Sequence, residues 1–222
     1  MPEQNRESSL VLIKPDALKN SLTGYILSLF AEFHTGLRFA ALKVVAVNLA
    51  LAEEHYAEHK GKFFYASLLE YIRGYLHYPD EPSKRRVIAI IYRGPNAIKQ
   101  IREICGNTNP HEARAQRPGC IRSLGTIIPL YDANGKFIGD RSDNLIHASA
   151  NAQDAEREIK LWFLPTDIPP TVRSYPAETS KEYYYYKNGA VSAEYVPGSY
   201  CFIGPGDLVW KSDMKVLRQI AK

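Results

Sequence analysis

Two short, continuously apolar runs, at residues 9–13 and 86–92, limit the possible fold more than any other feature of the sequence. Neither run alternates between apolar and polar residues, so each is expected to be a strand buried on both faces. The first run stops at Lys14-Pro15, because proline has no N–H to donate to a sheet. These strands indicate a sheet whose two faces are covered by other elements.

The segments around these strands predict an alternating order of helices and strands. Helical spacing or composition predicts helices, and valine-rich or alternating stretches predict strands. The expected helices cover residues 22–33, 50–59, 63–72, 97–105 and 151–163. The further expected strands cover residues 37–47 and 126–131, the latter turning at 132–135 and returning over 136–139. This order fits an α+β sandwich with a ferredoxin-like βαββαβ antiparallel sheet covered by helices, plus an extra hairpin and a C-terminal extension.

Composition and sequence character divide the 222 residues into a large domain, 1–165, and an extension, 166–222. The extension begins with a proline-rich linker at 167–176 and ends with a short helix at 214–220. Between them, Asn188-Gly189 predicts a hairpin turn after four successive tyrosines. These tyrosines could stack on nucleic-acid bases, but a half-buried face or a subunit contact is the favoured interpretation.

The net charge of +4, with a pI near 8.8, fits an anionic substrate but is too small and dispersed to indicate specific nucleic-acid binding. Three cysteines without CxxC spacing predict neither a disulfide framework nor a zinc site. Residues 1–9 are polar and contain acids, so no signal peptide is predicted. No apolar run approaches membrane-spanning length. A cytoplasmic location, without membrane partners, is the resulting expectation.

Three features are candidates for chemistry, each with a structural alternative. His147 lies in a segment, residues 144–149, just before a predicted helix, and a neutral imidazole is a good nucleophile near pH 7. A lone histidine beside apolar residues is more often a core or capping residue. Lys14 lies at a strand end, where ligands often bind, or is simply solvated. The long polar stretch 106–125, expected to be a functional loop without secondary structure, contains arginines that could hold phosphate or merely face solvent.

Several separated motifs, in a fixed order, carry a resemblance to a known family. They are Lys14-Pro15-Asp16, Glu54-His55-Tyr56 with Phe63-Phe64, Gly106-Asn107-Thr108-Asn109-Pro110, Arg117-Pro118-Gly119-Cys120-Ile121-Arg122, Asn144-Leu145-Ile146-His147, and residues 156–163 of the closing helix. With these motifs the sequence resembles the nucleoside diphosphate kinases over residues 9–163. That family transfers the γ-phosphate of a nucleoside triphosphate to a nucleoside diphosphate through a phosphohistidine.

The resemblance implies a role for each matching residue. His147 would be the nucleophile, Glu158 would hold its other ring nitrogen, and Ser149 would support the histidine region. The implied nucleotide-binding residues are Lys14, Tyr56, Phe64, Arg102, Thr108, Arg122 and Asn144. Phe64 would stack on the base, which implies broad base specificity. Mg²⁺ is the implied cofactor, held mainly by the nucleotide phosphates and not by a protein carboxylate cage.

The resemblance also implies a homo-oligomer, with a hexamer favoured and a dimer or tetramer as alternatives. Three departures set this chain apart from the family pattern. Ala148-Ser149-Ala150 stands where the family usually has Gly-Ser-Asp, and insertions lie near residues 75–85 and 130–140. These departures leave an alternative to an active kinase: a low-activity or inactive nucleotide-binding regulatory module of the same fold.

Overall fold

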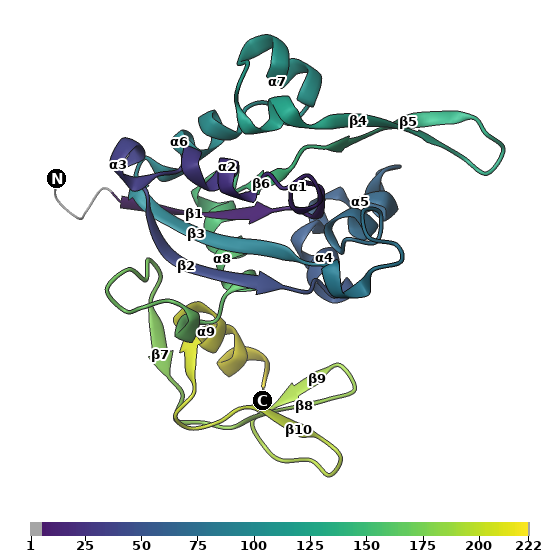
Figure 1. Cartoon of the computed structure of the whole chain (residues 1–222). Coiled ribbons are helices and arrows are strands. Elements are labelled where there is room, and N and C mark those ends of the chain that lie inside the picture. Colours follow the sequence, from purple (N-terminus) through teal and green to yellow (C-terminus); the bar gives the residue numbers. More distant parts are fainter. Residues whose placement is uncertain (1–5, 222) are drawn as a thin grey trace. The chain divides into compact units, whose positions relative to one another are not determined.

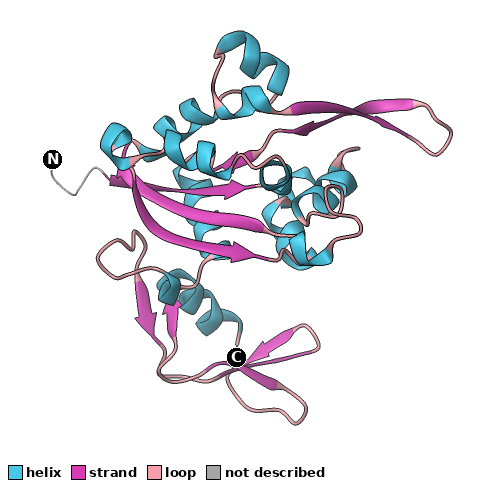
Figure 2. Cartoon of the chain, viewed as in Figure 1, coloured by secondary structure: helices cyan, strands magenta, loops and turns pink. Residues whose placement is uncertain are grey.

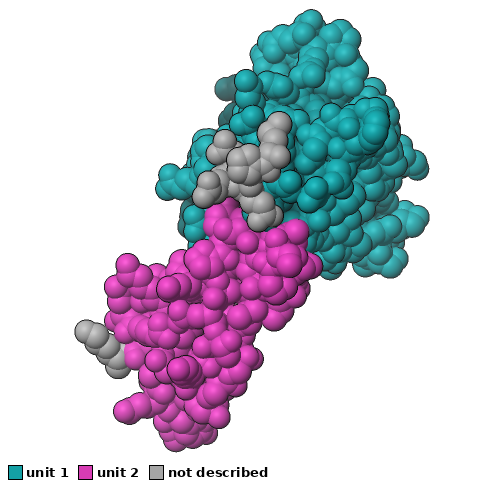
Figure 3. Space-filling view, turned by 90° about the vertical axis from the view of Figure 1, so that its left-hand side faces the viewer, with its two compact units in different colours: residues 1–162 teal, residues 163–222 magenta. Residues whose placement is uncertain are grey.

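The structure, a computed structural model, describes residues 6–221 and separates into two compact units, Met1–Trp162 and Phe163–Lys222 (Figure 3). Residues 1–5, part of the segment for which no signal peptide was predicted, lie outside the described part. The domain boundary predicted after residue 165 falls a few residues beyond this division, in a 3-10 turn at Pro165–Asp167. Each unit has its own sheets and helices (Figures 1 and 2).

A four-stranded antiparallel sheet forms the centre of the first unit. Its strands are β1 (Arg6–Ile13), β2 (Arg38–Val45), β3 (Val87–Pro95) and β6 (Ile146–Ala148), in the order β2-β3-β1-β6. This arrangement confirms the predicted α+β, ferredoxin-like fold with an additional hairpin and a C-terminal extension. The two apolar runs of the sequence are the paired central strands β1 and β3.

Strand β1 lies inside the sheet, between β3 and β6, and helices cover both of its faces. Its residues Leu10, Val11, Leu12 and Ile13 are all fully buried. Val11 and Ile13 belong to the main hydrophobic core, which also contains apolar side chains of α2 (Thr23–Leu29) and α6 (Ala97–Cys105). Helix α8 (Ala152–Trp162) also packs against β1. Complete burial on both faces explains why the sequence of this strand does not alternate.

The shorter helices of the first unit correct two predictions. They are α1 (Pro15–Lys19), α3 (Glu32–Thr35), α4 (Leu49–His55), α5 (Tyr65–Ile72) and α7 (Pro110–Gln116). The helix predicted over 22–33 is interrupted, since α2 ends at Leu29 and α3 begins at Glu32. The stretch 106–125 was wrongly predicted to lack secondary structure. It contains α7, whose N-cap Asn109 accepts hydrogen bonds from two backbone N–H groups.

Strands β4 (Thr126–Tyr131) and β5 (Phe137–Asp143) form the predicted hairpin, but they pair only with each other. Figure 1 shows this hairpin as a separate two-stranded ribbon. No strand was predicted at residues 146–148, where the fourth strand of the main sheet lies. That place is taken by the three-residue strand β6, which contains His147.

The second unit consists of two small sheets and one helix. Its elements are β7 (Ala177–Thr179), β8 (Tyr184–Lys187), β9 (Ala190–Ser192), β10 (Tyr200–Ile203), β11 (Leu208–Trp210) and α9 (Lys211–Ile220). The predicted tyrosine hairpin is present, with Asn188 and Gly189 at φ 48° and 86°. Tyr184, Ile203 and Met214 belong to the small hydrophobic core of this unit. Among the described residues, no helix has the length and apolarity needed to cross a membrane.

Candidate active site

A tight turn positions the histidine strand. The N–H of Ile146 donates to the Asn144 carbonyl at 2.8 Å, so Leu145 is the centre of a γ-turn and has a φ of 70°. This conformation is uncommon for a branched residue and persists only where its surroundings hold it. Here the buried Asp16 carboxylate accepts the Leu145 N–H at 2.9 Å. The turn sends the chain back along β1 and so places His147 in the sheet.

The register of β6 on β1 determines which way His147 faces. His147 pairs with Leu12, and residues paired across strands point to the same side of a sheet. Its neighbours Ile146 and Ala148 point to the other side and join the main core. His147 therefore lies away from that core, on the side where α8 supplies Glu158.

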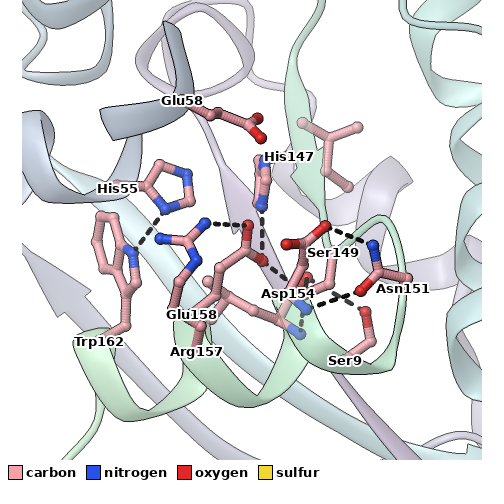
Figure 4. A network of polar contacts seen from close by, with 12 residues as sticks. Ser9, His55, Glu58, His147, Ser149, Asn151, Asp154, Arg157, Glu158 and Trp162 are labelled. Atoms are coloured by element: carbon pink, nitrogen blue, oxygen red, sulfur yellow. Dashed lines mark hydrogen bonds and ion pairs between the residues drawn. The ribbon is translucent and has the colours of Figure 1, made fainter. Parts of the chain in front are cut away.

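Glu158 and Ser149 fix the orientation of the His147 ring (Figure 4). His147 Nε2 lies 3.0 Å from Glu158 Oε2, and Ser149 Oγ donates to the same oxygen at 2.7 Å. Ser149 is held in turn by the Leu10 N–H at 3.1 Å. Since a carboxylate only accepts hydrogen bonds, Nε2 of a neutral His147 carries the proton. The lone pair is then on Nδ1, which makes Nδ1 the nucleophilic atom.

The Glu158 carboxyl remains ionised in this arrangement. Burial alone would raise its pKa, but the interaction with His147 and the hydrogen bond from Ser149 outweigh burial, so the pKa lies below its ordinary value. A negative Glu158 stabilises positive charge on the His147 ring. Any charge that develops there when Nδ1 forms a bond is therefore compensated.

A second histidine lies beside the first but is held in a different state. Trp162 Nε1 donates to His55 Nδ1 at 3.2 Å, and the His55 ring packs edge-on against His147 with 4.5 Å between the ring centroids. Burial lowers the pKa of His55 well below its ordinary value, so it is neutral. Because Nδ1 accepts a hydrogen bond, Nε2 bears the proton. This buried N–H has no partner among the described residues.

His55, His147 and Glu158 are also the one group in the described chain whose ligand atoms lie close enough to hold a metal ion, within 4.8 Å of one another. The hydrogen bonds argue against that use. Nε2 of His55 is protonated, and Glu158 already binds His147 and Ser149. Mg²⁺ in particular prefers oxygen ligands in octahedral geometry. These residues do not fit a metal centre.

The site also contains a buried positive charge, the side chain of Lys14. Its Nζ donates to Asn144 Oδ1 at 2.7 Å, and Asn144 Nδ2 donates to the Thr108 carbonyl at 2.9 Å. Burial lowers the pKa of Lys14 to about 8; the Asp16 carboxylate opposes this shift and Arg122 adds to it. Lys14 is thus held close to its titration point at neutral pH.

Arg122 and Tyr56 add further buried donors. Arg122 donates to the carbonyls of Gly106 and Ile146 at 2.9 and 3.2 Å, which leaves its Nε–H without a partner in the described structure. The Tyr56 hydroxyl is likewise unpaired there, and burial raises its pKa, so it stays protonated. With His55 Nε2, these residues give the site three buried N–H or O–H donors that have no partner among the described residues. Such groups are costly unless a ligand accepts from them.

The residues that carry these three donors, His55, Tyr56 and Arg122, all line one pocket with a volume of about 430 Å³. Of the ten residues predicted for the site, the pocket brings together nine: Lys14, Tyr56, Phe64, Arg102, Thr108, Arg122, Asn144, His147 and Glu158. Ser149 lies behind Glu158 and does not line it.

The pocket also contains residues that sequence reasoning missed: His55, Glu58, His59, Leu68, Asp140, Arg141, Ser142 and Ala148. His55 is adjacent to Tyr56 in a motif that had been singled out, so its position was a usable signal. Asp140, Arg141 and Ser142 lie on β5, the returning strand of the hairpin. Their presence in the pocket depends on how the hairpin packs, which no local pattern reveals.

The fold and the site define a class of protein: a ferredoxin-like α+β sandwich whose edge strand presents a histidine to a pocket of donors suited to an anion. Comparisons with known proteins agree with this class. The sequence model of the nucleoside diphosphate kinase family matches residues 7–168. Nucleoside diphosphate kinases from Pyrococcus furiosus and Mycobacterium bovis are 38% and 40% identical to this chain over 162 and 157 residues. These matches cover 73% and 71% of this chain and 86% and 96% of the two relatives.

Solved structures show the same relationship. The Aquifex aeolicus nucleoside diphosphate kinase has a TM-score of 0.58 and 31% identity, and the match covers 74% of this chain and 99% of the other. A Borrelia burgdorferi nucleoside-diphosphate kinase with bound vanadate and ADP has a TM-score of 0.57 and 28% identity, covering 78% and 95%. The chain belongs to the nucleoside diphosphate kinase family, a family of phosphotransferases.

Proposed function

We propose that this chain transfers the γ-phosphate of a nucleoside triphosphate to a nucleoside diphosphate, in two half-reactions, through a phosphohistidine on His147. The observation that carries the proposal is that His147, oriented with Nδ1 free, lies in one pocket with three residues whose buried donors have no partner among the described residues. A donor set of this kind suits phosphate oxygens, and a free imidazole nitrogen suits attack on phosphorus.

The first half-reaction needs no proton from the protein. Nδ1 of His147 attacks the γ-phosphorus, and the bond to the bridging oxygen breaks, so the electron pair leaves with the nucleoside diphosphate. The imidazole ring becomes positive as the N–P bond forms, and the ionised Glu158 at Nε2 stabilises it. In the second half-reaction an acceptor diphosphate attacks the same phosphorus and His147 is regenerated.

The other pocket residues are suited to bind the phosphates, the ribose and the base of the nucleotide. Lys14, Arg102 and Arg122 place positive charge beside the phosphates, and Tyr56 and Thr108 add hydroxyl donors. Asn144, held by Lys14, is suited to a ribose hydroxyl. Phe64 offers a ring for the base. The substrate is the Mg²⁺ complex of the nucleotide, and the ion neutralises phosphate charge without a protein carboxylate cage.

Exchange of label between nucleotides tests the proposal. Incubation with γ-labelled ATP and Mg²⁺ should give a phosphoprotein that is stable in alkali and labile in acid, with the label on the peptide that contains His147. Adding GDP to the labelled protein, after ADP has been removed, should then transfer the label to GTP and leave the protein unlabelled. Nucleotide binding without any labelled enzyme or labelled product would instead support the regulatory-module alternative.

Lys14 should give the reaction an alkaline limit. Its pKa of about 8 means that Lys14 is charged below this pH and neutral above it. We expect kcat/KM, which reports groups of the free enzyme, to fall as the pH rises through about 8. The Lys14→Met variant should have a lower kcat/KM that no longer shows this limb between pH 7 and 9. An unchanged limb in the variant would assign the titration to another group.

We also propose a homo-oligomer, with a hexamer favoured over a dimer or tetramer. Phe39, Leu42 and Val44 of the edge strand β2 are 56%, 51% and 59% exposed, which supports an apolar contact surface. Light scattering after size-exclusion chromatography measures the mass directly. A monomer at micromolar concentration would contradict the proposal.

A further inference from the structure

Both backbone groups of Leu145 are held by the segment that follows β1. The Leu145 N–H donates to Asp16 Oδ2 at 2.9 Å, and the Leu145 carbonyl accepts from the Lys14 N–H at 2.9 Å. Asp16 is buried and lies in α1, which begins at Pro15. Because the fixed φ of proline suits the first position of a helix, Pro15 gives Asp16 a defined place beside the turn. Residues 14–16 therefore hold this turn as one unit.

The turn at Leu145 lies between two residues of the proposed site. Asn144 precedes it and accepts a hydrogen bond from Lys14 Nζ at 2.7 Å, and His147 follows two residues later in β6. Leu145 has a φ of 70°, which a branched residue adopts only where its surroundings hold it. A relaxed turn would move the His147 ring relative to Glu158 and to the pocket. The hydrogen bond to the Asp16 side chain opposes this relaxation.

Asp16 also places a negative charge beside the Lys14 ammonium. Burial lowers the pKa of Lys14 to about 8, and Asp16 opposes this shift more than any other group does. The other titratable groups that face Lys14, from the elements packed around it, are Arg122, Asp143, Cys105, Tyr71 and the neutral His55. The Asp16 carboxylate therefore helps to keep Lys14 charged at neutral pH, as a site for phosphate requires.

The charges of Asp16 and Lys14 support each other. Burial raises the pKa of Asp16 and the neighbouring Asp143 adds to the rise, whereas Lys14, the Tyr71 hydroxyl and His77 act against it. Lys14 thus favours the ionised form of Asp16, and Asp16 favours the ionised form of Lys14. A change at either residue should alter the charge of the other.

We propose that Asp16 is a positioning residue for the transfer: its hydrogen bond to Leu145 holds His147 in place, and its charge keeps Lys14 protonated beside the phosphates. This inference rests on the proposed function, in which His147 and Lys14 act on the nucleotide. Asp16 acts through these residues, since it is not part of the pocket lining. One buried carboxylate thereby controls both the place of the nucleophile and a charge that binds the substrate.

Asp16→Asn separates the two actions, because asparagine keeps an oxygen for the Leu145 N–H but has no charge. Without the carboxylate, Lys14 should lose its proton about one pH unit lower than in the unaltered chain. NMR of the nucleotide-free chain, labelled with ¹³C at the lysine Cε, measures this titration, and Lys14→Met assigns the signal. The alkaline fall of kcat/KM should move by the same amount. Phosphoenzyme formation should therefore be slowed more at pH 8 than at pH 6, where Lys14 stays charged.

Asp16→Ala removes the acceptor together with the charge. Single-turnover labelling with γ-labelled ATP should be about 10²-fold slower in Asp16→Ala than in Asp16→Asn at every pH, since a small displacement of a nucleophile is enough for such a loss. Asp80→Asn, the same replacement at an exposed position, is the matched control and should change neither the Lys14 titration nor the labelling rate.

Thermal melting checks that each variant is folded, and Asp16→Asn decides through the Lys14 titration if Asp16→Ala is not. A Lys14 titration that does not move in Asp16→Asn would overturn the inference. Labelling that is as fast in Asp16→Ala as in Asp16→Asn would overturn it as well. The expected shift of the Lys14 titration, in a chain that forms no phosphoenzyme at all, would overturn only the proposed function.

Discussion

Replacing His147 with alanine should abolish phosphoenzyme formation and lower phosphate transfer between ATP and GDP by at least about 10⁴-fold, because no other group can take its place in the chemistry. His147 Nδ1 is the nitrogen left free when Nε2–H donates its hydrogen bond to Glu158. Single-turnover labelling with γ-labelled ATP measures the first half-reaction, and the exchange assay measures both. Nucleotide binding should persist, since the donors of Lys14 and Arg122 remain.

The other histidines of the pocket explain why no substitute nucleophile is expected. His55 accepts the Trp162 N–H on Nδ1 and has its proton on Nε2, so neither nitrogen has a free lone pair. The ring of His59 is engaged through Nδ1 with Lys62 Nζ at 2.9 Å. His34→Ala, a change at an exposed position on α3, is the matched control and should label normally. An acid-labile label that survives in His147→Ala would assign the reaction to another residue.

Local signals in the sequence predicted the parts of the fold in which one segment determines its own structure. The apolar run of β1 and its stop at Pro15 are of this kind, because burial on both faces and the missing proline N–H act within a few residues. Helix α8 was predicted for the same reason, since its buried Ala155, Ile159 and Trp162 recur at helical spacing.

Strand β6 could not be predicted in this way. It has three residues, too few for a periodic pattern, and it exists because Leu145 adopts a left-handed conformation that Asp16 stabilises from another segment. Helix α7 was missed although Asn109-Pro110 is a recognisable helix start. The many polar residues and arginines of this stretch obscure the capping signal.

The residues of the candidate site also fall into a predictable and an unpredictable group. Residues within recognisable motifs were predicted, and the structure brings nine of those ten into the pocket. The position of Arg141 in the pocket was not predictable, because Arg141 binds Asp143, whose carboxylate also binds His77 from a distant segment. Such contacts arise from tertiary packing, and neither segment has a pattern that indicates the other.

Replacing Gly106 with alanine should lower the free energy of unfolding by about 3 kcal/mol, because backbone strain and a steric clash add at this position. Gly106 ends α6 at φ 82° and ψ −175°, a region that residues with a side chain rarely adopt. An added Cβ would also lie 2.3 Å from Cys120 Sγ in the core beside α7. Urea denaturation of the variant and the unaltered chain measures the change.

Gly119→Ala separates the two causes. Gly119 also has a positive φ, 87°, but a Cβ there would meet nothing within 4 Å, so this variant should lose only about 1 kcal/mol. Adding Cys120→Ala to Gly106→Ala removes the clashing sulfur and should recover part of the larger loss. Because the Gly106 carbonyl accepts from Arg122 NH1, Gly106→Ala should also lower kcat/KM, whereas Gly119→Ala should not. Equal destabilisation by the two single variants would show that backbone strain alone acts at Gly106 and that the packing against Cys120 can relax.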